Sequence, residues 1–389
     1  MEPRAIAILG ATGSIGTTTL QVVRAHPTLL KVAGLAARSR WRELVGPVRE
    51  FGVRVIALAD PSAAAAARAS GEFPAGTRIL EGEAGLTEVA CLPEVAMVVS
   101  AVVGTAGLAP TLAALEARKD VALASKELLV LAGKFVTATA RRTGARLLPV
   151  DSEHNAIFQL LRDKPAADIA RLVLTASGGA FRDTPPDRLG EVTLAQALKH
   201  PNWDMGPKVT IDSATMANKG LELIEARWLF DMPVERIDVV VHPQSIIHSL
   251  VTLTDGSLQA LLSPPSMAYP IQDCLLFPRR LPCPAPRLDL ATALTLSMSP
   301  PDPARYPCLG LARDAARAGG TAPAVFNAAN EVAVEAFVAG HLPFLGIAEL
   351  VARTLAACPA REPGSLAEVL AADGEARRTA SRLAPGLAR

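Results

Sequence analysis

The sequence predicts an α/β protein that begins with a parallel β-sheet, continues as an α+β region and ends in helices. Within residues 1–150, short β-rich apolar runs alternate with stretches of helical periodicity such as Thr17–His26 and Thr111–Arg118. The apolar runs are Ala5–Leu9, Val32–Ala36, Val53–Ala59, Met97–Val103, Val121–Ala124 and Leu147–Val150. Because this alternation is typical of a parallel sheet covered by helices on both faces, we expect that architecture in the N-terminal region.

The pattern changes after residue 150. Strands are expected at Leu172–Thr175, Val239–His242 and Ile246–Thr252, and the last should turn back into Leu258–Leu262 as an antiparallel hairpin. Prolines crowd residues 263–307, and a helical pattern follows them, most clearly in Thr321–Phe337. We therefore predict domains at residues 1–150, 151–276 and 306–389, with a proline-rich linker at 277–305.

Charge and cysteine content argue against several classes of protein. The 389 residues carry a formal net charge of +1 without a cluster of Lys and Arg, so no nucleic-acid partner is expected. The uncharged stretch Val95–Leu115 contains Gly104, Gly107 and Pro110, and we interpret it as a strand, a loop and a helix rather than a membrane segment. Five scattered cysteines without a C-x-x-C pair indicate free thiols and a cytoplasmic location.

A glycine-rich turn, Gly10–Gly16 (GATGSIG), connects the first expected strand to a helix. Glycines here let the backbone approach a pyrophosphate, whose charge then lies at the helix N-terminus. A tight turn without a ligand has the same spacing, but the position at the start of a βαβ unit favours a dinucleotide site. The second strand ends in Ala37, Arg38 and Ser39 without Asp or Glu, so Arg38 suits the 2′-phosphate of NADP, unless it is an ordinary surface arginine.

Two carboxylates follow the run Leu147–Val150. Asp151 and Glu153 occupy alternate positions at the carboxyl end of a strand, where they can converge. Hard oxygen ligands of this kind suit Mg²⁺ or Mn²⁺. The alternative is a capping cluster, with Asp151 or Ser152 as N-cap of a helix that starts near His154.

Two further strand ends carry polar groups. Lys126 and Glu127 follow Val121–Ala124, where open α/β sheets bind ligands, although such a pair also forms at the start of a helix. Ser177–Gly179 follows Leu172–Thr175 and can offer a hydroxyl and backbone amides to an anion, or it is a flexible loop.

The segment His200–Gly206 (HPNWDMG) places Trp203 in an expected loop. Exposing a tryptophan is costly unless it covers something, so we interpret this loop as a lid over a bound ligand. The alternative is a loop that Trp203 packs on the core.

The segment Asp212–Glu222 (DSATMANKGLE) combines polar groups in a helical pattern. A helix beginning near Ala214 would place Asn218 and Glu222 on one face, with Ser213 at its start and Lys219 adjacent. Such a face could bind an anion and supply a metal carboxylate, or it is a solvated helix face.

Taken together, these motifs closely resemble those of the 1-deoxy-D-xylulose 5-phosphate reductoisomerase family. The resemblance covers most of the chain, including Asn327–Phe337 (NAANEVAVEAF), and is most specific in Pro149–Gln159 and Asp212–Glu222. It implies a homodimer that converts 1-deoxy-D-xylulose 5-phosphate to 2-C-methyl-D-erythritol 4-phosphate in isoprenoid precursor biosynthesis, using NADPH and a divalent metal. The domains would then be an NADPH-binding domain, a catalytic and connecting domain, and a C-terminal helical domain.

The resemblance also implies roles for individual residues. The metal, Mn²⁺ or Mg²⁺ with Co²⁺ as a further candidate, would be held by Asp151, Glu153 and Glu222. The substrate would be contacted by Lys126 and Ser152, its phosphate by Ser177, Ser213, Asn218 and Lys219, and a mobile loop with His200 and Trp203 would close over it. The NADPH site would comprise Thr12, Gly13, Ser14, Ile15, Ala37, Arg38, Ser39, Ser125, Glu127 and Gly206.

Three positions depart from the family pattern. Ser125 stands where the family usually has asparagine, Ala37 replaces a frequent glycine, and Leu128 replaces a usual serine. Two other classes remain as alternatives: an NADP-dependent oxidoreductase of other small phosphorylated or amino-acid-derived aldehydes, and a non-catalytic NADP sensor. A sensor would have no need for three carboxylates and a phosphate-binding loop.

Overall fold

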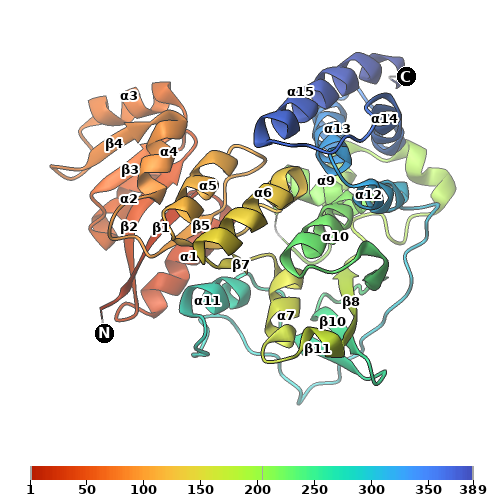
Figure 1. Ribbon diagram of the computed structural model, residues 1–389, viewed down its shortest axis with the longest axis horizontal. Coiled ribbons are helices and arrows are strands. Elements are labelled where there is room, and N and C mark those ends of the chain that lie inside the picture. Colours follow the sequence, from red (N-terminus) through yellow and green to blue (C-terminus); the bar gives the residue numbers. More distant parts are fainter. Residues whose placement is uncertain (1, 204, 388–389) are drawn as a thin grey trace. The chain divides into compact units, whose positions relative to one another are not determined.

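The computed structural model describes residues 2–203 and 205–387, and the chain forms two compact units (Figure 1). Unit 1 comprises residues 1–128, 135–155 and 266–287, and unit 2 comprises residues 129–134, 156–265 and 288–389. Each unit is therefore assembled from separate stretches of the chain. The division into four successive segments made from the sequence stays a prediction.

Unit 1 contains a seven-stranded parallel sheet with strand order β4-β3-β2-β1-β5-β6-β7. The strands are β1 (Arg4–Leu9), β2 (Leu30–Ala37), β3 (Val55–Leu58), β4 (Arg78–Glu81), β5 (Met97–Ser100), β6 (Asp120–Leu123) and β7 (Leu147–Pro149). Except for β4, they are almost wholly buried apolar runs, as the sequence predicts for a covered parallel sheet. The expected α/β fold is thus confirmed.

The strand β4 was not expected. Its sequence, Arg-Ile-Leu-Glu, has exposed charged ends and only partly buried apolar residues, because β4 lies at the edge of the sheet. A short edge strand with charged ends lacks the continuous apolar run that marks a buried strand.

Most helices of unit 1 connect successive strands, and one comes from a later part of the chain. They are α1 (Ser14–Ala25), α2 (Arg42–Phe51), α3 (Pro61–Ser70), α4 (Gly82–Ala90), α5 (Leu108–Glu116) and α11 (Ala268–Leu276). Two further helices contribute residues to both units, α6 (Glu127–Thr143), which is kinked at Ala132, and α7 (Ser152–Leu161). The distant α11 is fixed in unit 1 by Arg4, whose guanidinium donates to the Leu275 carbonyl (2.8 Å), and by a 2.8 Å contact between His26 Nε2 and Gln272 Oε1.

Unit 2 contains a four-stranded sheet with strand order β11-β10-β8-β9. The strands are β8 (Ile169–Ala176), β9 (Ile237–Val241), β10 (Ile247–Leu253) and β11 (Leu258–Leu262). β10 and β11 form the expected antiparallel hairpin, whereas β8 and β9 run parallel. This mixture confirms the α+β character expected after residue 150.

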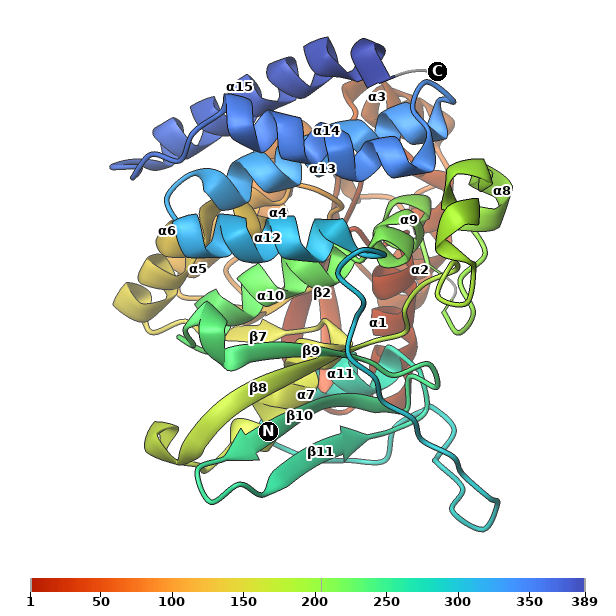
Figure 2. The same cartoon turned by 90° about the vertical axis from the view of Figure 1, so that its right-hand side faces the viewer.

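Helices complete unit 2 (Figure 2). They are α8 (Leu194–Ala197), α9 (Pro207–Thr215), α10 (Ala217–Leu229), α12 (Pro307–Ala318), α13 (Ala322–Val338), α14 (Phe344–Ala357) and α15 (Leu366–Leu383). α10 packs against β8 and β9 on one side and against α12 on another, so it joins the sheet to the C-terminal helices. Among the described residues, no helix is long and apolar enough to cross a membrane.

Candidate active site

The glycine turn of unit 1 has the geometry that a phosphate-binding turn needs. Gly10 has φ +91°, and a Cβ there would lie 2.3 Å from the Ala101 carbonyl oxygen. A Cβ on Gly16 would lie 2.4 Å from the Gly10 carbonyl oxygen, so only glycine lets α1 begin this close to β1. Gly13, by contrast, has no neighbour closer than 3.4 Å. Two glycines are thus required by packing, while Gly13 leaves open backbone immediately before Ser14, the first residue of α1.

The residues expected to contact the ribose and its 2′-phosphate lie at the end of β2. Ala37 is buried, whereas Arg38 and Ser39 are exposed. Arg40 donates from its Nη2 to the Thr12 carbonyl (2.6 Å) and pairs with Glu43, so it braces the glycine turn. Arg38 is thus an exposed cation at the end of β2, and no acidic residue stands at this strand end in the sequence.

Ser125 follows β6 and is buried. Its hydroxyl donates to the Val102 carbonyl (2.5 Å), so it connects the loop after β5 to the loop after β6. Glu127, also buried, begins α6, and Leu128 behind it is fully buried. The serine that replaces the family's usual asparagine thus has a structural hydrogen bond of its own.

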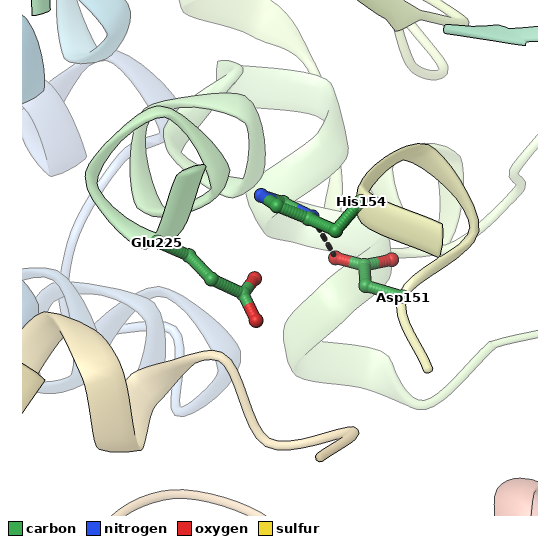
Figure 3. A group of neighbouring side chains, drawn as sticks. All are labelled: Asp151, His154 and Glu225. Atoms are coloured by element: carbon green, nitrogen blue, oxygen red, sulfur yellow. Dashed lines mark ion pairs between the residues drawn. The ribbon is translucent and has the colours of Figure 1, made fainter. Parts of the chain in front are cut away.

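Lys126 and Asp151 form an ion pair inside unit 1. Lys126 Nζ lies 2.5 Å from Asp151 Oδ2. His154 Nδ1 lies 3.7 Å from the same oxygen, and Figure 3 shows these two side chains. Burial alone would raise the pKa of Asp151, but the charge of Lys126 and the contacts with His154 hold that pKa well below its usual range. The lowered pKa keeps the largely buried Asp151 carboxylate ionised, and charged oxygen ligands are the kind that hard divalent cations prefer.

The helix after β7 begins at Ser152, two residues before the expected start near His154. Ser152 donates to the Glu153 carboxylate (2.6 Å). Asn155 donates to the Pro149 carbonyl (3.1 Å) and to Asp273 on α11 (3.2 Å). These contacts fix the first turn of α7, and the link to α11 was missed from the sequence because its two residues are 118 positions apart.

The loop Ser177–Gly179 packs directly on α9 in unit 2. Gly179 has φ +71°, and a Cβ there would lie 2.5 Å from both the Ala214 Cα and the Ser213 carbonyl oxygen. The Tyr306 hydroxyl donates to the Gly178 carbonyl (2.9 Å) from the residue before α12. The loop is thus held at Ser213, and Ser177 and Ser213 belong to one local structure. Tyr306 was not expected in this role.

His200 orders the loop that it begins. Its Nδ1 accepts the backbone N–H groups of Asn202 (3.1 Å) and Trp203 (3.0 Å), so this nitrogen carries no proton. The proton of the neutral ring is on Nε2, which donates to the Ser177 hydroxyl oxygen (2.8 Å). Ser177 also accepts from the Gly179 amide (3.1 Å), so its own O–H is left to donate elsewhere, as a phosphate-binding hydroxyl must.

The rest of the expected lid is anchored by a residue that the sequence did not single out. Asn202 donates to the Pro243 carbonyl (2.5 Å) and to the Ser245 hydroxyl (2.8 Å). Trp203 is half-buried, and Gly206 immediately precedes α9 in unit 2. Asp204, which belongs to the same motif, lies outside the described residues.

The segment Asp212–Glu222 is a helix–elbow–helix and not one helix. α9 ends at Thr215, Met216 has φ +57°, and α10 begins at Ala217. The expected helix start near Ala214 was therefore wrong, and Ser213 lies in the last turn of α9. The left-handed Met216 breaks the helix, and sequence periodicity does not reveal a single residue of this kind.

The polar residues of α10 nevertheless share one face, as expected. Asn218 donates to Glu222 Oε1 (2.7 Å), and Lys219 forms an ion pair with Glu222 Oε2. Lys219 and Glu222 are both buried, so the solvated-face alternative does not describe them. The elbow thus carries Ser213, Asn218 and Lys219 on two short helices of unit 2, with Glu222 one turn further along.

Comparison with known proteins agrees with these motifs. Three family profiles match successive parts of the chain: 1-deoxy-D-xylulose 5-phosphate reductoisomerase at residues 6–133, its C-terminal domain at 147–230, and the DXP reductoisomerase C-terminal domain at 262–379. The 1-deoxy-D-xylulose 5-phosphate reductoisomerase of Chlorobium phaeobacteroides is 50% identical over 382 residues, covering 98% of this chain and 99% of the relative. That of Dechloromonas aromatica is 51% identical over 384 residues, covering 97% and 96%.

The chain belongs to the 1-deoxy-D-xylulose 5-phosphate reductoisomerase family. Solved structures of the family agree with the fold. The enzyme from Zymomonas mobilis in complex with NADPH has a TM-score of 0.92 at 41% identity, covering 99% of this chain and 100% of that chain. A family structure in complex with NADPH, fosmidomycin and magnesium has a TM-score of 0.92 at 42% identity, covering 98% of both chains. The expected family and the enzyme class, an oxidoreductase, are confirmed.

The expected site residues are distributed over both units. Unit 1 holds Lys126, Asp151, Ser152, Glu153 and the expected NADPH residues other than Gly206. Unit 2 holds Gly206, His200, Trp203, Ser177, Ser213, Asn218, Lys219 and Glu222. The individual roles of these residues stay predictions.

Proposed function

We propose that the residues described above divide the family's reaction among a cofactor site, a metal site and a phosphate site. That reaction is the NADPH- and divalent-metal-dependent rearrangement and reduction of 1-deoxy-D-xylulose 5-phosphate to 2-C-methyl-D-erythritol 4-phosphate, in isoprenoid precursor biosynthesis. The proposal rests above all on the match of this chain to its relatives almost from end to end. The chain also has the glycine turn before α1 and the elbow between α9 and α10 that the proposed sites need.

We assign NADPH to the turn and strand end of unit 1. Gly13 and the N-terminus of α1 would receive the pyrophosphate, and Arg38 would pair with the 2′-phosphate. The remaining contacts would come from Thr12, Ser14, Ile15, Ala37, Ser39, Ser125, Glu127 and Gly206. Support for NADPH over NADH comes from the missing acidic residue at the end of β2.

We assign the divalent cation, Mn²⁺ or Mg²⁺ with Co²⁺ as a further candidate, to the carboxylates of Asp151, Glu153 and Glu222. Three carboxylates form a hard oxygen ligand set, and the low pKa of Asp151 keeps it ionised despite burial. When bound, the cation supplies Lewis-acid stabilisation of the substrate's oxygen atoms. Lys126, which pairs with Asp151, would then be available to contact the carbonyl end of the substrate together with Ser152.

We assign the substrate's phosphate to Ser177, Ser213, Asn218 and Lys219. The Ser177 hydroxyl oxygen accepts from His200 and Gly179, so its own proton is available to donate to a phosphate oxygen. Lys219 adds a buried positive charge on the first turn of α10. Binding energy gained here, away from the reacting carbons, would hold the substrate in a reactive orientation. The loop with His200 and Trp203 would exclude water when it closes.

We also propose a cytoplasmic homodimer. The edge strand β11 exposes Leu258 and Leu262, and the segment after residue 287 exposes Leu290, Leu294 and Met298. An edge strand and exposed apolar side chains are features that a second copy of the chain can cover. The five cysteines are free, which suits a reducing compartment.

The proposed activity can be tested by following NADPH absorbance with 1-deoxy-D-xylulose 5-phosphate and Mn²⁺. We expect oxidation of NADPH that requires both the metal and the phosphorylated substrate. Omission of the metal and replacement of the substrate by unphosphorylated 1-deoxy-D-xylulose serve as controls. Binding of NADPH without any turnover would favour the sensor, and turnover of other aldehydes alone would favour the rival oxidoreductase. A mass consistent with a dimer in light scattering would support the assembly.

A further inference from the structure

The helix α13 carries two buried asparagines that the reaction described above does not use. Asn327 and Asn330 are both fully buried, and they lie three positions apart on the same helix. Asn327 donates to Glu331 on its own helix (3.3 Å). Asn330 instead donates from Nδ2 to Asp212 Oδ1 on α9 (2.8 Å), a residue 118 positions earlier. Only the second asparagine therefore connects α13 to the elbow.

Asp212 is a buried carboxylate whose two oxygens both have partners. Its side chain is 1% exposed, Oδ1 accepts from Asn330, and Oδ2 lies 2.8 Å from Lys208 Nζ one turn earlier in α9. Because an ionised carboxylate in this setting needs donors, the Asn330 amide can face it only through Nδ2. Burial, followed by the charge of Asp212, raises the pKa of the neighbouring Cys308 thiol to about 12.

Asp212 lies next to the residues that we assign to the phosphate site. Asp212 directly precedes Ser213, and the left-handed Met216 and the first turn of α10 with Asn218 and Lys219 follow. The backbone at Ser213 and Ala214 also packs against Gly179 of the Ser177 loop without room for a Cβ. A rotation or shift of α9 would therefore move Ser213 and press on the loop that carries Ser177.

We propose that Asn330 and Asp212 are positioning residues of the phosphate site, through which helix α13 fixes the α9–α10 elbow. Neither side chain needs to touch the substrate for this role. The inference rests on the proposed function, because it takes Ser177, Ser213, Asn218 and Lys219 as the phosphate ligands. It assigns to the C-terminal part of the chain a contribution to substrate binding in addition to its packing.

The variant Asn330→Ala tests this role, and Asn327→Ala is its matched control. Both remove a fully buried amide from α13, but only Asn330→Ala removes the bond to Asp212. We expect Asn330→Ala to raise KM for 1-deoxy-D-xylulose 5-phosphate about tenfold, with kcat changed less than about threefold, because misplaced ligands weaken binding. Asn327→Ala should lower Tm without changing KM. Equal KM values for the two variants would overturn the proposal.

A second measurement does not depend on turnover. Inorganic phosphate should raise the Tm of the wild type and of Asn327→Ala by the same amount, and it should raise that of Asn330→Ala less. General salt effects cancel in this comparison because they act on all three proteins. An equal rise in all three would contradict the proposal.

If Asn330→Ala does not fold, Asp212→Asn is the second variant, because it keeps the shape and removes the charge that faces Lys208 and Asn330. The same rise in KM with kcat retained is expected, and an unchanged KM would overturn the proposal. The activity of the wild type distinguishes failure of the proposed function from failure of the positioning role. A wild type without NADPH oxidation removes the proposed function, whereas an active wild type with unaffected Asn330→Ala and Asp212→Asn removes only the role of these residues.

Discussion

The ammonium group of Lys126 lies 2.5 Å from a carboxylate oxygen of Asp151, and the two side chains are only 10% and 15% exposed. Sequence reasoning had paired Lys126 with its neighbour Glu127 as the structural alternative. The ion pair between Lys126 and Asp151 connects the start of α6 to the residue before α7, so it brings together two motifs that are far apart in the sequence.

The first prediction concerns the stability that this pair contributes. Lys126→Met should lower the free energy of unfolding by on the order of 3 kcal/mol near neutral pH, because it leaves Asp151 as an uncompensated buried charge. Lys134→Met is the control, since Lys134 pairs with Glu362 at a site where both side chains are about half exposed or more, and such pairs contribute little. Urea unfolding in EDTA measures both. Equal losses in the two variants would contradict the prediction.

The same pair sets a pH dependence. The folded-state pKa of Asp151 is lowered, so its contribution to stability is fully present above its unfolded-state pKa of about 3.9 and is lost as the pH falls toward the folded pKa. In Lys126→Met the folded pKa rises, and the decline of Tm below about pH 5 should become shallower than in the wild type. If the Tm of the two proteins falls in parallel as the pH is lowered from neutral, Lys126 does not lower the pKa of Asp151.

The second prediction concerns the metal. EDTA should stop NADPH oxidation, and added Mn²⁺ or Mg²⁺ should restore it. Asp151→Asn, Glu153→Gln and Glu222→Gln should each abolish most turnover, because each removes one negative oxygen ligand. NADPH binding, measured by its fluorescence, should persist in all three. Full activity in EDTA would remove the metal from the mechanism and leave Asp151 as a structural residue.

The third prediction concerns cofactor choice. Arg38→Asp should weaken NADPH binding about ten- to a hundredfold, because a charge-assisted contact with the 2′-phosphate is worth about 1.5–3 kcal/mol. NADH binding should change little. Arg40→Ala is the comparison, since Arg40 braces the Thr12 carbonyl and should affect both cofactors alike. If Arg38→Asp weakens both cofactors equally, the specificity does not reside in Arg38.

The parallel sheet could be predicted from the sequence because each of its buried strands is a continuous apolar run, as in Ala5–Leu9. The edge strand β4 could not, since half of its four residues are charged. At the candidate site the residue types and motifs were readable, but the contacts between them were not. The elbow at Met216 depends on one backbone conformation, and the bond from Asn330 to Asp212 connects residues 118 positions apart, so neither leaves a periodic signal.

The fourth prediction concerns the loop that carries Trp203. Trp203 is half-buried, while Asn202 beside it is anchored to Pro243 and Ser245. If the loop closes on ligand, Trp203 becomes more buried and excludes water from the substrate, which strengthens the electrostatic contacts inside. Tryptophan fluorescence should therefore shift when substrate or a phosphonate hydroxamate analogue is added with metal.

Variants separate Trp203 from the two other tryptophans of the chain. Trp203→Phe should remove most of the fluorescence change and should raise KM or lower kcat without unfolding the protein, because the smaller ring covers the ligand less completely. Trp41→Phe is the control, since Trp41 is buried in unit 1 beside Arg42 and should leave the change intact. An unchanged spectrum in the wild type, together with a Trp203→Ala variant that mainly loses thermal stability, would make this loop a packed structural segment. Its anchoring by Asn202 would then serve the fold alone.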